Sequence, residues 1–477
     1  MYSEKLELLI DGKFREGSDG VTQPVTDPSS GKTIAQLPYA SMVDLDATLA
    51  ATQKGFETWN RMTANQRYQI MSRAADLIEA RKDDIARTLT LENGKILGEA
   101  LLEVQFTADQ TRWYAEEGKR IYGRIVPARL PNVQQKVLKE PVGPVAAFTA
   151  WNFPASNAIR KIAGALGAGC SIILKPSEET PGTAVAIARC FQDAGLPDGA
   201  LNIVFGVPTE ISTYLLKSAI IKKVSLTGST AVGKELLKLS AETVKRCTME
   251  LGGHAPVIVY DDADLERTLD TISAAKFRNA GQVCVSPTRF YVQEGVYEPF
   301  VAGFAERAGK ITLGSGLNTN TRMGPLIAER RITAMERFVR DAVEHGAKVV
   351  CGGERHGNEG HFFQPTVLRD VPDSAAIMNE EPFGPLVPIA SFKAEDEAIK
   401  RANRLVYGLA SFVFTRDSGR SSRTQVRLNA GMVGVNHTML STPETPFGGV
   451  NESGCGSESG VEGLEAYLRT KFVTETF

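Results

Sequence analysis

The strongest constraint on this fold is a regular alternation of short apolar runs and helical segments that begins near residue 145. Short buried strands that alternate with helices are typical of a parallel, doubly wound sheet. A first set of runs occupies residues 145–149, 171–174, 201–205, 223–227 and 256–260. A second set occupies residues 289–293, 348–351, 365–368, 388–392, 411–415 and 432–436. The sequence therefore predicts an α/β protein with two such units, divided near residue 253.

The segment before these runs has a different pattern. Residues 40–118 follow helical periodicity, with apolar side chains spaced by three and four at Ile70, Met71, Ala74, Leu77 and Ile78. Ser41 and Asp44 have the spacing of a capping box at a helix start. From Val133 to Val142 the residues alternate as in a strand, and we expect this strand to leave the body of its own domain.

Composition and charge exclude several classes of protein. Of the 477 residues 42% are hydrophobic and 23% are charged, which is ordinary for a globular chain. A net charge of −2 gives no reason to expect a nucleic-acid or charged-membrane partner. The N-terminus carries charge at Glu4 and Lys5 without the apolar core of a signal peptide, and no long apolar run predicts a membrane span. The six cysteines form no CxxC pair, so we expect no metal site and a reducing, cytoplasmic location.

Cys284 is a candidate nucleophile. It ends the segment FRNAGQVC, where a Gly-Gln pair lets the backbone turn sharply and present a thiolate to a cleft. A lone free cysteine is more often a small buried hydrophobe, so the alternative interpretation is a structural cysteine.

Glu250 is a candidate general base. In the segment MELGG it stands between apolar residues and before a glycine turn, where desolvation raises the pKa of a carboxyl group. A carboxylate with a pKa near neutrality can accept a proton in catalysis. The alternative is a glutamate that caps or pairs at a strand end.

Three further segments follow predicted strands, where ligands bind in open α/β sheets. Asn152, in TAWNFP, could direct an amide donor at an oxyanion together with the backbone N–H of Cys284, although asparagine is also a common turn former. Ser229, in LTGST, begins a helix suited to a pyrophosphate, but the motif is not a GxGxxG fingerprint. Lys175 and Glu178, in ILKPSEETP, could hold a ribose or could be solvated loop charges.

Together these segments resemble the aldehyde dehydrogenase superfamily. The motifs TAWNFP, ILKPSEETP, LTGST, MELGG, FRNAGQVC, NEEPFGP and PFGGV occur in the family's order and at its spacing over essentially the whole chain. The resemblance implies a Rossmann-type coenzyme domain, an α/β catalytic domain and a small β oligomerisation arm. The corresponding residues are 1–120 with 144–252, then 253–452, and for the arm 121–143 with 465–477. Such an arm implies a homo-oligomer, either a dimer or a tetramer, because an exposed strand edge is otherwise a liability.

The resemblance also implies a mechanism and a cofactor. Cys284 would attack an aldehyde to give a thiohemiacetal and then a thioester, Asn152 would hold the oxyanion, and Glu250 would activate water. Lys161 and Glu458 match the family's proton relay. Residues that match its contacts to a nicotinamide dinucleotide are Trp151, Lys175, Glu178, Ser229, Glu381 and Phe383. The Glu178 carboxylate favours NAD over NADP because it repels a 2′-phosphate, although Lys175 and its neighbour Ser177 leave NADP possible.

Two arginines bear on the substrate. Arg160 lies eight residues past Asn152 and Arg289 five residues past Cys284, and both match positions where semialdehyde dehydrogenases of the family bind a distal carboxylate. The resemblance further implies that Phe153 and Phe447 wall the pocket. We therefore expect 2-oxoglutarate semialdehyde or succinate semialdehyde as the substrate.

Alternatives to this substrate and mechanism follow from the same residues. The two arginines could instead form structural salt bridges, which would leave a general enzyme for neutral aldehydes. A second cysteine two positions after the nucleophile, frequent in succinate semialdehyde dehydrogenases, is replaced by Ser286, which favours the 2-oxoglutarate semialdehyde group. An acylating enzyme would not need Glu250, and a catalytically silent structural relative would not need the intact set of site residues.

Overall fold

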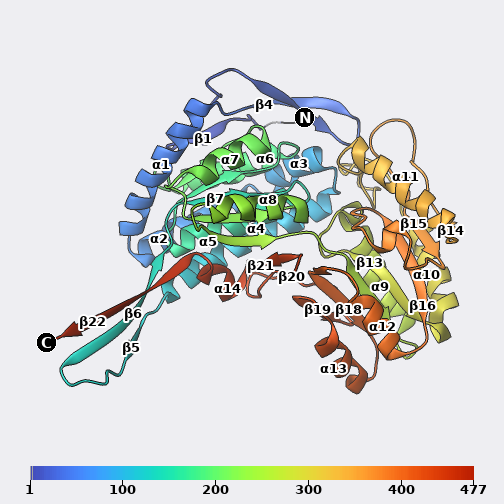
Figure 1. Cartoon of the computed structure of the whole chain (residues 1–477). Helices are drawn as coiled ribbons and strands as arrows, with labels where there is room; N and C mark the ends of the chain where they lie inside the picture. The colour runs from blue at the N-terminus through green and yellow to red at the C-terminus, as the bar shows by residue number, and fades with distance from the viewer. Residues whose placement is uncertain (1, 3) are drawn as a thin grey trace.

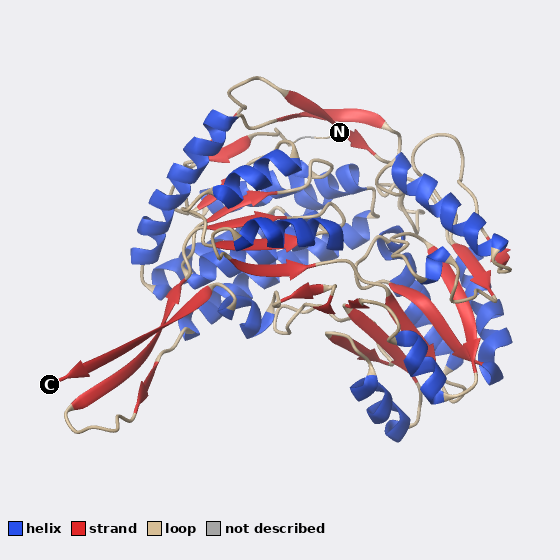
Figure 2. Cartoon of the chain, in the orientation of Figure 1, coloured by secondary structure: helices blue, strands red, loops and turns tan. Residues whose placement is uncertain are grey.

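Two large sheets surrounded by helices make up the body of the protein, and a slender arm projects from one side (Figure 1). The computed structural model describes residue 2 and residues 4–477. Residues 1 and 3, which belong to the predicted domain 1–120, lie outside the described part. Figure 2 shows helices packed around the strands of both sheets, which is the layered arrangement of an α/β protein.

The first sheet has eight strands in the order β2-β1-β9-β8-β7-β10-β11-β21, and the five from β9 to β11 run parallel. The strands are β1 Leu8–Ile10, β2 Lys13–Arg15, β7 Val145–Phe148, β8 Ile172–Lys175, β9 Leu201–Ile203, β10 Lys223–Thr227, β11 Arg246–Glu250 and β21 Gly454–Cys455. The doubly wound parallel sheet predicted from the apolar runs is confirmed. The sequence pattern does not predict β11, because its residues carry charge at both ends and lack an apolar run.

The helices of the first body belong mostly to the N-terminal half of the chain. They are α1 Met42–Arg61, α2 Ala64–Ala80, α3 Lys82–Asn93, α4 Leu97–Glu117, α5 Pro154–Ala168, α6 Pro181–Asp193, α7 Pro208–Lys217 and α8 Thr230–Ala241. The predicted capping box of Ser41 and Asp44 is present at the start of α1. α5 is buried along its whole length, because α4 and α6 pack against it. Any polar side chain that α5 carries must therefore find its partners inside the protein.

The second sheet has seven strands in the order β14-β15-β16-β13-β12-β18-β19. They are β12 Ala255–Val259, β13 Pro287–Gln293, β14 Lys348–Cys351, β15 Thr366–Arg369, β16 Leu386–Phe392, β18 Ala410–Phe414 and β19 Met432–Val435. Its helices are α9 Leu265–Phe277, α10 Tyr297–Gly309, α11 Glu329–Glu344, α12 Glu395–Ala402 and α13 Ser418–Arg427. The run 256–260, grouped by its rhythm with the first set, lies instead at the centre of this second sheet, between β13 and β18.

The chain returns to the first sheet after the second is complete. β21 pairs with β11, and α14, Gly460–Glu465, then packs on α5. The chain passes between the two sheets twice, once after Gly252 and once before Ser453, and hydrogen bonds hold these two segments together. Ser453 Oγ donates to the carbonyl of Gly252 at 2.7 Å, and the Ser453 carbonyl accepts from Leu251 N at 3.0 Å. Two small two-stranded sheets are also present, the hairpin of β3 Thr22–Asp27 with β4 Lys32–Pro38 and the antiparallel pair of β17 Tyr407–Gly408 with β20 Val450–Asn451.

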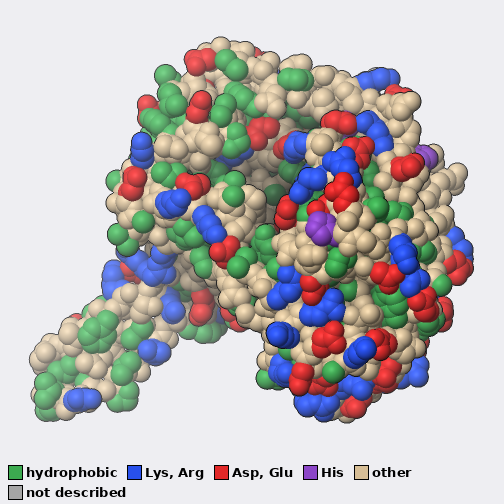
Figure 3. Space-filling model, turned by 45° about the vertical axis from the view of Figure 1, so that its right-hand side comes forward, with side chains coloured by type: hydrophobic (Ala, Val, Ile, Leu, Met, Phe, Trp, Pro, Cys, Tyr) green, Lys and Arg blue, Asp and Glu red, His purple; other side chains and the backbone are tan. Residues whose placement is uncertain are grey.

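The arm is a three-stranded sheet that extends away from the body (Figure 1). It consists of β5 Arg124–Val126, β6 Val133–Pro141 and β22 Leu468–Thr476, and β22 pairs with β6 along its whole length. The strand predicted from Val133 to Val142 is confirmed as β6. Several hydrophobic side chains are visible on the arm (Figure 3), and its exposed apolar residues include Ile125, Leu130, Leu138 and Phe472. The role of the arm in oligomerisation stays a prediction.

No helix within residues 4–477 is long and apolar enough to cross a membrane. The same residues hold no cluster of side chains that could bind a metal ion.

Candidate active site

Cys284 follows a tight turn between α9 and β13. Within this turn Asn279 and Ala280 have left-handed φ angles of 48° and 53°, which strain a residue that has a Cβ atom. The neighbouring structure fixes them, because Asn279 N donates to Glu99 Oε2 at 2.9 Å and Ile327 N donates to Gln282 Oε1 at 2.9 Å. The turn therefore presents the thiol in a rigid position.

Glu250 lies at the end of β11, close to the thiol of Cys284. Burial raises the pKa of Glu250 to about 7, and the nearby carboxylate of Glu458 adds to the shift. Burial and then Glu250 raise the pKa of the Cys284 thiol well above its usual range. Glu250 Oε1 has no hydrogen-bond partner among the described residues. The pair thus combines a protonated thiol with a carboxylate that can accept its proton near neutral pH.

Asn152 reaches the same turn from the other sheet. It follows β7, and its Nδ2 donates to the carbonyl of Gln282 at 3.3 Å, two residues before Cys284. Its Oδ1 accepts from Asn157 Nδ2 at 3.1 Å, which fixes the orientation of the amide. The second amide hydrogen and the main-chain N–H of Cys284 are the donors available for an oxyanion on the carbon that the thiol attacks.

Lys161 and Glu458 form a buried ion pair behind Glu250. Lys161 projects from α5, and its Nζ also donates to Thr227 Oγ1 at 2.7 Å. Ser225 Oγ donates to the same Glu458 oxygen at 3.4 Å. The sequence does not single out Thr227 or Ser225 as partners, because both lie inside an ordinary buried strand.

Arg160, one residue earlier on α5, faces the nucleophile. Its side chain is buried, and its charge lowers the pKa of both Cys284 and Glu250. The guanidinium lies 4.0 Å from the centre of the Phe447 ring and donates from Nη2 to Ser441 Oγ at 2.5 Å. Its Nε has no partner among the described residues, which leaves a donor for a ligand.

Arg289 does not share this environment, and the expectation that it binds a substrate carboxylate is not supported. Its guanidinium donates to the main-chain carbonyls of His254 at 3.0 Å, Arg401 at 3.2 Å and Ala402 at 2.9 Å. Two of these carbonyls end α12, where helix carbonyls lack partners. Arg289 therefore stabilises the second sheet and its helix.

Arg278 is a cation near the pocket that the sequence reasoning misses. It precedes the turn, its side chain is exposed, and its guanidinium lies 5.2 Å from the centre of the Phe153 ring. Phe153 itself packs against the hydrophobic core of the second sheet. An exposed arginine six residues before a cysteine carries no signal that separates it from a solvated charge.

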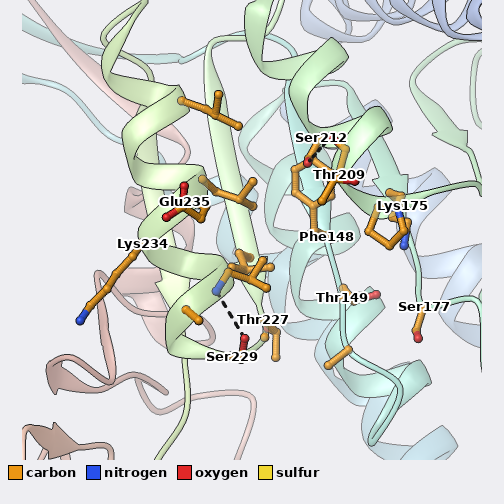
Figure 4. A pocket seen from close by; sticks show the side chains of 18 of the residues that line it. Phe148, Thr149, Lys175, Ser177, Thr209, Ser212, Thr227, Ser229, Lys234 and Glu235 are labelled. Atoms are coloured by element: carbon orange, nitrogen blue, oxygen red, sulfur yellow. Dashed lines mark hydrogen bonds between the residues drawn. The ribbon is translucent and has the colours of Figure 1, made fainter.

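A cavity of about 1120 Å³ lies beside the C-terminal ends of β7, β8 and β10. Figure 4 shows Thr227, Ser229 and Lys234 on one side and Thr149 and Lys175 on the other. Ser229 caps α8 by accepting from Val232 N at 3.4 Å, so the helix N-terminus opens into the cavity. That terminus suits a phosphate.

The ion pair of Lys175 and Glu178 lies on the wall of this cavity. Burial raises the pKa of Glu178, and Lys175 opposes that shift. A carboxylate and an ammonium beside a helix N-terminus and apolar walls match the hydroxyl, phosphate and base groups of a dinucleotide. The lining residues thus fit such a cofactor.

Two further residues that match cofactor contacts, Trp151 and Phe383, lie next to the lining of the cavity. Its lining includes Ala150, and the next residue, Trp151, packs edge to face on Phe383 with ring centres 5.5 Å apart. Glu381 accepts from the main-chain N–H of Gly253 at 3.3 Å, and burial raises its pKa to about 8. The negative charge of Glu250 adds to this shift, so the two carboxylates lie near each other.

Comparison with known proteins agrees with this geometry. A model of the aldehyde dehydrogenase family matches residues 14–473. The mitochondrial succinate-semialdehyde dehydrogenase of Arabidopsis thaliana is 44% identical over 98% of this chain and 88% of its own length. A 4-(hydroxymethyl)benzenesulfonate dehydrogenase of Comamonas testosteroni is 45% identical over 98% of this chain and 97% of its own length. The crystal structure of succinate-semialdehyde dehydrogenase from Burkholderia pseudomallei matches with a TM-score of 0.98 and 40% identity, covering 99% of this chain and 98% of that chain.

Proposed function

The chain belongs to the aldehyde dehydrogenase family, whose members use NAD or NADP, and we propose that it oxidises a short semialdehyde with a distal carboxylate to the dicarboxylic acid. The leading substrates are 2-oxoglutarate semialdehyde and succinate semialdehyde. The observation that carries the proposal is Arg160, a buried cation with an unused donor that faces Cys284. Its fork suits a carboxylate, and Phe447 beneath it holds the guanidinium in place.

The proposed reaction begins at the pair of Cys284 and Glu250. Glu250 accepts the thiol proton, and Sγ attacks the aldehyde carbon to give a thiohemiacetal. Asn152 Nδ2 and the main-chain N–H of Cys284 stabilise the oxyanion. When NAD or NADP is bound, its nicotinamide supplies the acceptor for the hydride that leaves this carbon as the thioester forms.

Hydrolysis of the thioester uses the same base a second time. Glu250 first releases its proton along the buried groups of Glu458 and Lys161, then accepts a proton from the attacking water. Its pKa of about 7 suits both transfers. The acid leaves and the thiol is restored.

Glu178 supports NAD as the preferred cofactor. Glu178→Gln is expected to raise the ratio of kcat/KM with NADP to that with NAD about tenfold, because the variant no longer repels a 2′-phosphate. Steady-state kinetics with both cofactors measure the ratio. Glu235→Gln, on the opposite wall of the cavity, is the matched control and should leave the ratio unchanged. An unchanged ratio in Glu178→Gln would show that Glu178 does not determine the preference between NAD and NADP.

Arg160→Met tests the proposed substrate. We expect kcat/KM for the two semialdehydes to fall about 10- to 100-fold relative to neutral aldehydes of matched length, because a charge-assisted hydrogen bond is lost. The relative value isolates substrate binding, since Arg160 also affects the pKa of Cys284 and Glu250. Production of NADH or NADPH measures both rates.

The outcomes of the Arg160 experiment separate the possible substrates. If the wild-type protein oxidises neutral aldehydes as fast as the two semialdehydes, it is a general aldehyde dehydrogenase. A preference for a sulfonate-bearing aldehyde over both semialdehydes would replace the carboxylate in the proposal.

Arg289→Met has a different expected effect. The variant leaves buried main-chain carbonyls without donors, so the free energy of unfolding should fall by about 3 kcal/mol. Denaturant unfolding measures the loss, and KM for the semialdehydes should stay within about twofold of the wild type. A large rise in KM with an unchanged free energy of unfolding would instead show that Arg289 binds the substrate.

The remaining parts of the proposal concern assembly and location. We infer that residues 1–120 with 144–252 bind the cofactor and that residues 253–452 supply the catalytic domain. The arm, residues 121–143 and 465–477, joins copies of the chain into a dimer or a tetramer in the cytoplasm. The exposed apolar side chains of the arm support this role, because they need a partner surface.

A further inference from the structure

Three charged side chains, two buried and one half-buried, lie behind Asn152 at the junction of α3 and α4. We call Lys95, Glu99 and Glu103 the α3–α4 corner. Lys95 Nζ and Glu103 Oε2 form an ion pair at 2.5 Å, with side-chain exposures of 0% and 2%. Glu99 and Glu103 are one helical turn apart and lie on the same side of α4. Burying such charges is costly, and the α3–α4 corner has several further contacts that account for them.

The first contacts of the α3–α4 corner fix the backbone around Asn152. Lys95 Nζ donates to the main-chain carbonyl of Asn152 at 2.8 Å and lies 3.9 Å from the centre of the Phe153 ring. Glu103 Oε1 accepts from the main-chain N–H groups of Ala155 and Ser156 at 3.0 and 3.1 Å. These groups begin α5, whose N-cap residue, Phe153, makes no side-chain cap. Glu103 therefore supplies the cap from another helix.

The second set of contacts fixes the turn that presents Cys284. Glu99 Oε2 accepts from Asn279 N at 2.9 Å, at one of the two strained positions of the turn. Asn279 Nδ2 in turn donates to the carbonyl of Asn152 at 2.9 Å and to the carbonyl of Gln282 at 3.3 Å. The carbonyl of Asn152 thus receives two donors, one from the α3–α4 corner and one from the turn.

We propose that the α3–α4 corner positions the oxyanion site, by holding the backbone of Asn152 and the turn before Cys284 at a fixed separation. The inference rests on the proposed role of Asn152 as the oxyanion donor. The three side chains contact neither the thiol nor the Asn152 amide, so they are positioning residues. Small displacements of oxyanion donors cost large factors in rate, because the stabilisation depends on preorganised geometry.

The test uses Lys95→Met/Glu103→Gln. This double variant removes both buried charges together, and the carboxamide still accepts the hydrogen bonds that cap α5. We expect kcat to fall about tenfold, with the Kd for NAD, measured by fluorescence titration, unchanged. Arg15→Met/Asp44→Asn removes another ion pair of the same body, far from the site, and should leave kcat unchanged.

A double-mutant cycle with Asn152→Ala separates positioning from general structural damage. Asn152→Ala keeps the main-chain carbonyl and so keeps every contact of the α3–α4 corner. If the corner acts through the Asn152 amide, Lys95→Met/Glu103→Gln should reduce kcat by less than about twofold in the Asn152→Ala background. An undiminished tenfold loss in that background would overturn the inference, as would an unchanged kcat in the otherwise wild-type protein.

The same cycle distinguishes this inference from the proposed mechanism. Asn152→Ala alone should lower kcat about 100-fold, and an unchanged kcat would contradict the oxyanion role itself. If the double variant does not fold, Glu103→Gln alone takes its place. Its smaller loss of about threefold must likewise vanish in the Asn152→Ala background.

Discussion

Replacing Cys284 with alanine is expected to abolish aldehyde oxidation, with kcat at least about 10⁴-fold below that of the wild type. No other thiol of the described residues can replace it, because Cys284 is the cysteine that lies beside Glu250. The cavity proposed for the dinucleotide is lined by other residues, so the Kd for NAD should remain within about twofold of the wild type. Cofactor reduction and fluorescence titration measure the two properties.

Cys455→Ala is the matched control for this substitution. Cys455 is exposed and lies on β21, so its variant should keep full activity. Substantial turnover in Cys284→Ala would end the claim that the reaction proceeds through this thiol.

Glu250→Gln is expected to slow turnover about 10³-fold, because the thioester loses the base that activates water. The first equivalent of cofactor per site should also form slowly, without a rapid burst, because Glu250 accepts the thiol proton before the thioester forms. Stopped-flow absorbance measures the formation of this first equivalent and the steady rate that follows. Full recovery of turnover on addition of coenzyme A would instead indicate an acylating enzyme.

The pH dependence of kcat provides a second test of the role of Glu250. Burial raises the pKa of Glu250 to about 7, and only the deprotonated form accepts a proton. The wild-type kcat should therefore rise with pH through about 7, and Glu250→Gln should lose this limb. A limb that survives the substitution would belong to another group.

The sequence predicts those parts of the fold whose local pattern and tertiary role agree. The apolar runs become β7 to β10 of the first sheet and every strand of the second, and the alternating run near residue 134 becomes β6 of the arm. In contrast, β11 is missed because tertiary pairing with β10 overrides its polar ends. The run 256–260 is a strand, as predicted, but rhythm alone cannot assign a strand to one of two sheets.

The sequence predicts which segments form the site, but not the direction in which each side chain points. The motif residues Asn152, Glu250 and Cys284 come together, because each ends a strand or a turn on the same edge. Arg289 lies close to Cys284 in sequence but within β13, where its side chain is directed to the end of α12. Nothing in the sequence marks Lys95 and Glu103 as a buried pair, and only packing shows what surrounds them.

The contacts of Ser453 have a consequence for the architecture of the gene product. Residues 253–452 are an insertion, because the chain leaves the first sheet at Gly252 and rejoins it at Ser453, within hydrogen-bonding distance. Every residue that lines the cavity proposed for the dinucleotide precedes the insertion. A few glycines in place of residues 253–452 would therefore join Gly252 to Ser453 and leave the first sheet uninterrupted, with the whole lining of this cavity retained.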